Sequence, residues 1–500
     1  MRTKKLAWNT ISSLIYQLTS LICGFILPQL ILHSYGSEVN GLVNSVAQFL
    51  QVVALLELGV GAVIQSSLYS PLARKDNELV SKIVVSGSRF FKRIAQILAF
   101  YVIILMAVYP KISNQNFDSV YTAALIFAMS ISSFAQYYFG IVDRLLLTAD
   151  QRGYIQYTAQ SITLVVNTIA CAALISFGSS IHMVKLVTSI IFLIRPLALR
   201  IYVNRHYKID RKITYDVEPI QQKWNGIAQH VAAFILDGTD NIVLTLFSTL
   251  TNVSVYSVYH LIIFGIKNLF LSLMNGIQSL IGEMWAKREL KELTRFFARI
   301  EWIIHTGVTY LFGCTAVLIV PFVQVYTKGI ADADYNVPKF AMLLTLANAL
   351  HCLRLPYNIM ILAGGHYKQT QGNYIIAAGL NVVISVVAVV HFGLVGVAVG
   401  TLAAMGYQTV WMALYDSRNL IRWPFKKFIR QLLIDIFSVV CGLLLTRGMI
   451  KEVVNYLEWL VLAVQIAAVW FGVVFVINIV FYKEHMIAVL KNISLKNLKR

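Results

Sequence analysis

Apolar runs of about 20 residues recur along the whole chain, and each is long enough to cross the hydrocarbon core of a bilayer. Only 13% of the residues are charged, whereas a soluble domain is usually about a quarter charged. The sequence therefore predicts an all-α integral membrane protein with 14 transmembrane helices. The predicted spans are 8–32, 40–68, 92–110, 119–142, 154–177, 182–203, 226–249, 252–282, 300–326, 338–363, 373–391, 394–416, 429–449 and 455–482.

The positive charges are distributed unevenly among the predicted loops. Of the 42 Lys and Arg residues, three fall within spans, 33 fall on one side with the N-terminus, and six fall on the other side. Because cytoplasmic loops retain Lys and Arg, both termini are predicted to be cytoplasmic. The net charge of +19 then suits anionic membrane lipids and disfavours nucleic acid as a partner. The six external cations are Lys111, Lys185, Lys328, Lys339, Arg447 and Lys451.

Paired motifs recur at separations of 206 to 215 residues. RFFKRI at 89–94 returns as RFFARI at 295–300, and N-x-x-V-x-S-V occurs at both 40–46 and 252–258. Asn167 and Asn381 occupy equivalent places in two later spans. The pattern predicts two parallel six-helix bundles, residues 1–210 and 211–428. An extra helix pair (spans 13 and 14) and a basic cytoplasmic tail follow at 429–500.

The repeated phrase has apolar residues at three- and four-residue spacing with Arg and Lys between them. This pattern is typical of a helix in the cytoplasmic membrane interface, with its apolar side in lipid. An ordinary loop helix with solvated charges is the alternative interpretation. Parallel repeats are found in transporters, whose substrate site lies between the two halves.

Four segments resemble the polysaccharide flippases of the Wzx type, a branch of the multidrug/oligosaccharidyl-lipid/polysaccharide (MOP) exporter superfamily. They are FLQVVALLELGVGAVIQSSLYSPLARKDNEL (49–79), FILDGTDNIVLTLFSTLTNVSVYSVY (234–259), TKGIADADYNVPKFAMLL (327–344) and ILAGGHYKQTQGNYI (361–375). Their order and spacing carry the resemblance, which covers essentially the whole chain.

This resemblance implies a multi-pass protein of the bacterial cytoplasmic membrane that moves an undecaprenyl-pyrophosphate-linked oligosaccharide to the outer leaflet. The product would feed O-antigen, capsule or exopolysaccharide biosynthesis, with a polymerase or ligase as a further partner. Drug-exporting relatives typically have twelve spans, so the fourteen predicted here favour the lipid-linked branch. In that branch, the extra pair is thought to help form a groove for the polyprenyl tail. A cation-coupled multidrug exporter and a lipid II flippase are the alternatives.

Cations within the membrane are expensive and mark candidate functional sites. The implied substrate carries a pyrophosphate, which the guanidinium of Arg354 would suit best because it pairs with phosphate in a bidentate fork. Lys267 and Arg195 are the other substrate-binding candidates, and Arg195 has snorkelling to the surface as an alternative. For all three, an ion pair or a helix-packing contact is the competing interpretation.

The candidate acids are Glu57, Asp237 and Asp240. Asp237 and Asp240 are three residues apart and share a helix face. The three could bind a coupling cation (H⁺ or Na⁺) or compensate Lys267 or Arg354. Asp435 is predicted to serve packing or the tail groove, and His305 is predicted to be a hydrogen-bonded packing residue.

An enzyme is disfavoured, and no cofactor is expected. The longest predicted external loops, near 110–119 and 327–338, are short, and no P-loop motif occurs. The five cysteines lie inside predicted spans without metal-ligand spacing, so no metal site is predicted. They are Cys23, Cys171, Cys314, Cys352 and Cys441.

Overall fold

The computed structural model describes residues 2–57, 60–113, 117–220, 227–421, 423–484 and 486, and these residues contain helices and no strand. Eleven helices in this part of the chain are long and apolar enough to cross a membrane. The predicted class, an all-α multi-pass membrane protein, is confirmed. The count of 14 spans and the orientation of the termini stay predictions.

The chain forms two compact units. Unit 1 contains residues 1–234 and 244–254, and unit 2 contains residues 235–243 and 255–500. The predicted bundle boundaries at 210/211 and 428/429 stay a prediction.

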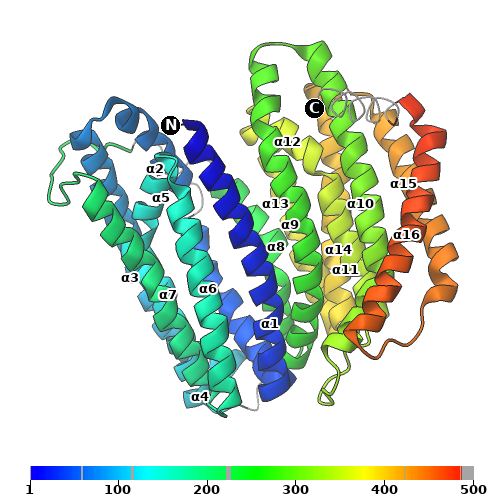
Figure 1. The fold of residues 1–500 in the computed structure, drawn as a ribbon, viewed down its shortest axis with the longest axis horizontal. Helices are drawn as coiled ribbons and strands as arrows, with labels where there is room; N and C mark the ends of the chain where they lie inside the picture. The colour runs from blue at the N-terminus through cyan, green and yellow to red at the C-terminus, as the bar shows by residue number, and fades with distance from the viewer. Residues whose placement is uncertain are drawn as a thin grey trace. The chain divides into compact units, whose positions relative to one another are not determined.

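Unit 1 is built from long helices that pack along one another (Figure 1), with α1 against α6, α6 against α7, and α4 against α7. Helix α1 is interrupted at Gly36, whose φ of 82° suits a residue without a side chain. This break separates the first two predicted spans. The elements are α1 (Arg2–Gln51), a 3₁₀ turn (Val52–Leu56), α2 (Val60–Arg74), α3 (Asn77–Ile112), α4 (Ser119–Ala135), a π-helical turn (Gln136–Gly140), α5 (Ile141–Ala149), α6 (Gly153–Ser176) and α7 (Ile181–His206).

Unit 2 has α13 packed on α14, α11 on α14, and α10 against α15 and α16 (Figure 1). Two further helices, α8 (Ile227–Phe247) and α9 (Leu250–Ala286), contribute residues to both units. The other elements are α10 (Leu290–Tyr326), α11 (Pro338–Leu353), α12 (Leu355–Ala363), α13 (Tyr367–Phe392), α14 (Leu394–Asn419), α15 (Phe425–Thr446), a 3₁₀ turn (Arg447–Met449) and α16 (Tyr456–Phe481).

The repeated phrase lies near the start of two long helices, α3 and α10. Phe91 and Ile94 are buried in unit 1, and Phe297 and Ile300 are buried at the same places of the phrase in unit 2. The prediction that the apolar side of this segment lies in lipid is therefore wrong. Its three- and four-residue spacing instead directs these side chains into the protein core, while the arginines of the phrase stay exposed.

Candidate functional site

Arg354 lies at the break between α11 and α12, where Pro356 in the first turn of α12 starts the new helix segment. Its side chain is buried inside unit 2. The guanidinium donates to the amide oxygen of Gln408 on α14, and its Nη2 lies 3.0 Å from Nδ1 of His351. The amide of Gln408 and the imidazole of His351 thus orient this buried cation.

The other two predicted cations have different surroundings. Lys267 lies on α9 and is buried within unit 2. Arg195 lies on α7 in unit 1, half-buried, with Nε donating to Thr163 Oγ1 at 2.6 Å and its guanidinium 3.8 Å from the ring of Phe192. It also lines a small cavity of about 40 Å³ beside the π-helical turn, together with Arg144.

Glu57 has a cationic partner that the sequence analysis did not identify. Its carboxylate accepts from Nη2 of Arg144 on α5 at 3.1 Å. Compensation of Lys267 or Arg354 by Glu57, and binding of a coupling cation, stay predictions.

Asp240 lies on α8, buried in a group of hydroxyl and amide side chains. Its Oδ2 accepts from Tyr256 Oη at 2.8 Å and from Thr401 Oγ1 at 2.9 Å. The amide of Asn381 donates to Thr401 at 3.2 Å and accepts from Thr239 at 3.2 Å. The side chain of Asp237 lies outside the described residues. Oxygen atoms from three helices thus gather around one carboxylate.

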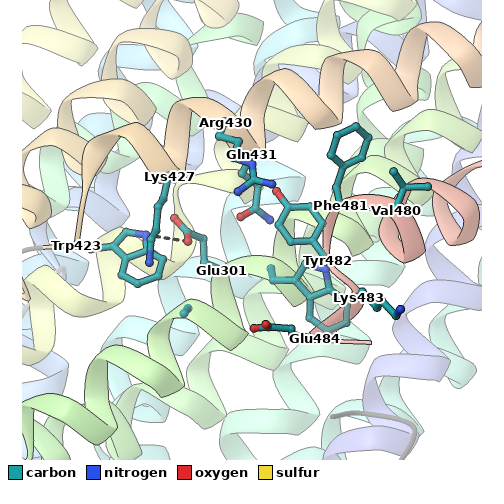
Figure 2. Close-up of a pocket in the computed structure, with 12 residues that line it drawn as sticks. Glu301, Trp423, Lys427, Arg430, Gln431, Val480, Phe481, Tyr482, Lys483 and Glu484 are labelled. Carbon is teal, nitrogen blue, oxygen red and sulfur yellow. Dashed lines mark hydrogen bonds between the residues drawn. The ribbon is translucent and has the colours of Figure 1, made fainter. Parts of the chain in front are cut away.

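A cavity of about 430 Å³ opens beside the first turns of α15, and Figure 2 shows its polar and aromatic lining. Glu301 of α10 faces Trp423, whose indole nitrogen donates to it at 2.9 Å. The cavity residues are Ala298, Glu301, Trp302, Trp423, Lys427, Arg430, Gln431, Val480, Phe481, Tyr482, Lys483 and Glu484.

Glu301 accepts one further hydrogen bond, and a cation lies over the ring of Trp423. The hydroxyl of Tyr357 on α12 donates to the second oxygen of Glu301, and the ammonium of Lys427 lies 4.0 Å from the ring of Trp423. At the far side of the cavity, burial raises the pKa of the Tyr482 hydroxyl above its usual range. The sequence analysis missed Glu301. Alignment of the two repeated phrases could have found it, because Ala95 stands at the same place in the first copy.

Comparisons with known proteins find similar structures but no similar sequences. No protein-family model matches the chain, and no curated protein matches it. The lipid II flippase MurJ in an inward closed conformation has a TM-score of 0.69 at 14% identity, over 96% of this chain and 99% of MurJ.

Two other solved structures match over a smaller part of the chain. An inward-facing multidrug resistance MATE family transporter of the MOP superfamily has a TM-score of 0.60 at 15% identity, over 80% of this chain and 94% of its own. A MOP superfamily transporter from Pyrococcus furiosus has a TM-score of 0.59 at 14% identity, over 83% of this chain and 96% of its own. At these identities a likeness shows the fold alone, and the protein described here has the fold of MOP-superfamily transporters.

Proposed function

We propose that this chain is a flippase that translocates undecaprenyl-pyrophosphate-linked oligosaccharides across the bacterial cytoplasmic membrane by alternating access of two helical bundles. The observation that carries the proposal is the extent of its fold similarity. The match to MurJ covers 96% of this chain, against 80% and 83% for the two other transporters. The remaining 4% of 500 residues is too short to contain both α15 and α16, so the similarity to a lipid flippase includes most of this added pair.

The product would supply O-antigen, capsule or exopolysaccharide biosynthesis. Because these units must then be joined, a polymerase or ligase is the proposed partner. The proposed topology has fourteen spans, with both termini in the cytoplasm. The break at Gly36 would divide one of the eleven candidate helices into two crossings. Helix α8 and the α11–α12 pair would add the remaining two.

Arg354 is the proposed ligand of the pyrophosphate. Its burial removes competition from water, and charge-assisted hydrogen bonds to phosphate are stronger under that condition. Gln408 and His351 fix the direction of the guanidinium. Lys267, also buried in unit 2, and Arg195 in unit 1 are proposed as additional contacts to the substrate.

The group around Asp240 is the proposed coupling site for H⁺ or Na⁺. Carboxylate, hydroxyl and amide oxygens are ligands that suit a hard cation, and the same carboxylate could accept a proton. Glu57 is assigned to charge compensation, because it is already paired with Arg144.

The test is flipping of a labelled undecaprenyl-pyrophosphate oligosaccharide in proteoliposomes by the wild type, Arg354→Ala and Arg354→Lys. We expect the Ala variant to lose at least about tenfold in rate, because a hydrogen bond to a charged group contributes about 1.5–3 kcal/mol. Lys should restore only part of the rate, since it lacks the bidentate fork. Arg447→Ala, which removes an exposed cation, is the matched control and should flip as the wild type does.

Other outcomes separate the alternatives. Equal flipping by the wild type and Arg354→Ala would make Arg354 a structural residue. Export of a cationic dye without lipid flipping would favour a multidrug exporter. Faster flipping of lipid II than of other lipid-linked oligosaccharides would favour a lipid II flippase.

A further inference from the structure

Two acids in unit 2 are buried outside the groups already assigned to substrate or coupling. Glu301 on α10 and Asp416 on α14 are each only 1% exposed, and their negative charges act on one another. Among the described residues, neither carboxylate oxygen of Asp416 has a hydrogen-bond partner. Two carboxylates as buried as these cannot both carry charge cheaply. One bound proton would remove the repulsion.

His305 gives a second, independent indication of a ligand. It follows Glu301 by one turn on the same face of α10 and is fully buried. Its Nδ1 lies 2.6 Å from Asp435 Oδ2, and its Nε2 has no hydrogen-bond partner among the described residues. The ring also interacts electrostatically with Glu301. An imidazole nitrogen is therefore left beside the acid.

The first copy of the repeat has neither of these polar groups. Ala95 and Ala99 of α3 stand at the places of Glu301 and His305. The neighbouring buried positions stay apolar in both helices, as in the pairs Ile94 and Ile300, Leu98 and Ile304, and Val102 and Val308. The acid and the imidazole are therefore particular to α10, whereas the apolar pattern is common to both helices.

Glu301 lines the cavity of Figure 2, whose lining also contains charged side chains of α15 and of the segment after α16. A metal ion is a poor occupant, because no group of three or more His, Cys, Asp or Glu in the described ranges could hold one. A proton needs a single acceptor atom. The titratable and charged groups that face this site are Glu301 and His305 (α10), Tyr357 (α12), Asp416 (α14), Lys427, Arg430 and Asp435 (α15), and Tyr482, Lys483 and Glu484 after α16.

We propose that Glu301 and Asp416 form a proton-binding site of unit 2, entered from water through this cavity, with His305 as the neighbouring acceptor. A hydronium ion in the cavity gives one proton to a carboxylate oxygen: an O–H bond of the hydronium ion breaks, an O–H bond of the carboxyl group forms, and a water molecule is left in the cavity. The site is separate from the group around Asp240. It does not depend on the identity of the transported substrate, since protons alone should occupy it.

Infrared spectroscopy of the purified full chain in lipid vesicles tests the proposal without substrate. The carbonyl band of a protonated carboxyl group is distinct from carboxylate bands and shifts when water is replaced by D₂O. We expect the wild type to show such a band at about pH 5, below the usual pKa of histidine. Asp416→Asn and Glu301→Gln should each remove or shift it.

Asp143 of α5 provides the matched control. It is as buried as Asp416, but Arg211 lies 2.9 Å and Arg200 3.6 Å from its carboxylate. Asp143→Asn should leave the band unchanged, because the cations already compensate the charge of Asp143. Glu301→Ala, which introduces the residue of the first copy, provides a second variant should Asp416→Asn fail to fold.

Three results would overturn the proposal. The first is a wild-type spectrum without a protonated-carboxyl band, which needs no variant. The second is a band that persists unchanged in folded Asp416→Asn and Glu301→Gln. The third is a band that disappears on addition of Na⁺ at constant pH, because the site would then bind a cation in place of a proton.

Discussion

Helices α3 and α10 contain nearly the same sequence motif, RFFKRI and RFFARI, but they have different neighbours. In the most apolar stretch of α3, 33% of the residues are buried, against 61% in α10. The outer face of α3 exposes Phe100 and Ile103, as suits contact with lipid, whereas Thr309 at the place of Ile103 is buried. The difference arises because α15 and α16 pack on α10. Contact with α15 and α16 thus buries more of α10 than of α3.

Helices α10, α15 and α16 pack closely because glycines of α10 and α15 lie against a tryptophan of α16. Trp470 of α16 is fully buried, and a Cβ atom at Gly313 or Gly442 would lie within 3 Å of its ring. Cys314, Val317 and Leu318 of α10 complete this core with Leu462 and Ile466 of α16. In α3 the residue at the place of Gly313 is Ala107, which is exposed.

The largest effect is expected from Trp470→Ala. Loss of the ring leaves a cavity between α10, α15 and α16, and truncation of a buried Trp typically costs about 3–5 kcal/mol. The free energy of unfolding in detergent measures this cost. Phe100→Ala, on the exposed face of α3, is the control and should change it by less than about 0.5 kcal/mol. Equal losses would mean that the two helices do not differ in packing.

Gly313→Val should have the next largest effect. The first added carbon would lie 2.0 Å from the ring of Trp470, so either the ring or α16 must move. Overpacking of this kind costs about 1–3 kcal/mol. Ala107→Val at the equivalent place of α3 should be nearly neutral in the same unfolding measurement. A neutral Gly313→Val would show that α16 is held elsewhere.

The periodic part of the molecule could be predicted from the sequence. Hydropathy and spacing predict long helices, and the buried places of RFFKRI and RFFARI coincide because one pattern yields one packing face. Glu301 was missed because a single acid near the start of an apolar run resembles an interfacial residue. Its burial depends on Tyr357 and Trp423, which lie 56 and 122 residues away in the sequence.

The partners of the charged side chains also could not be predicted from the sequence. Glu57 meets Arg144, 87 residues later, and the amide of Gln408 orients Arg354 from 54 residues away. Composition and hydrophobic periodicity predict which face of a helix is buried. They do not predict which side chain of a distant helix contacts that face. The recurrence of Asn167 as Asn381 likewise did not predict the hydrogen bond between Asn381 and Thr401.

Trp302→Phe should have the smallest effect on the free energy of unfolding. It tests how much a polar contact, as opposed to apolar packing, holds α16 on α10. The indole nitrogen of Trp302 donates to Asn478 Oδ1 at 2.6 Å, joining α10 to α16. Phe keeps most of the packing, and the same oxygen still accepts from Thr306 Oγ1 at 3.3 Å. We therefore expect a loss of only about 1 kcal/mol in the free energy of unfolding, the usual net contribution of one hydrogen bond.

Gln96, the exposed residue of α3 at the place of Trp302, provides the control, and Gln96→Ala should be neutral. A loss for Trp302→Phe as large as that for Trp470→Ala would mean that hydrogen bonding, and not the Trp470 core, holds the added pair on α10. A small loss would instead assign the stability of this contact to packing. The polar groups along α10, Glu301 and His305 among them, would then be available for proton binding without being needed to hold the helices together.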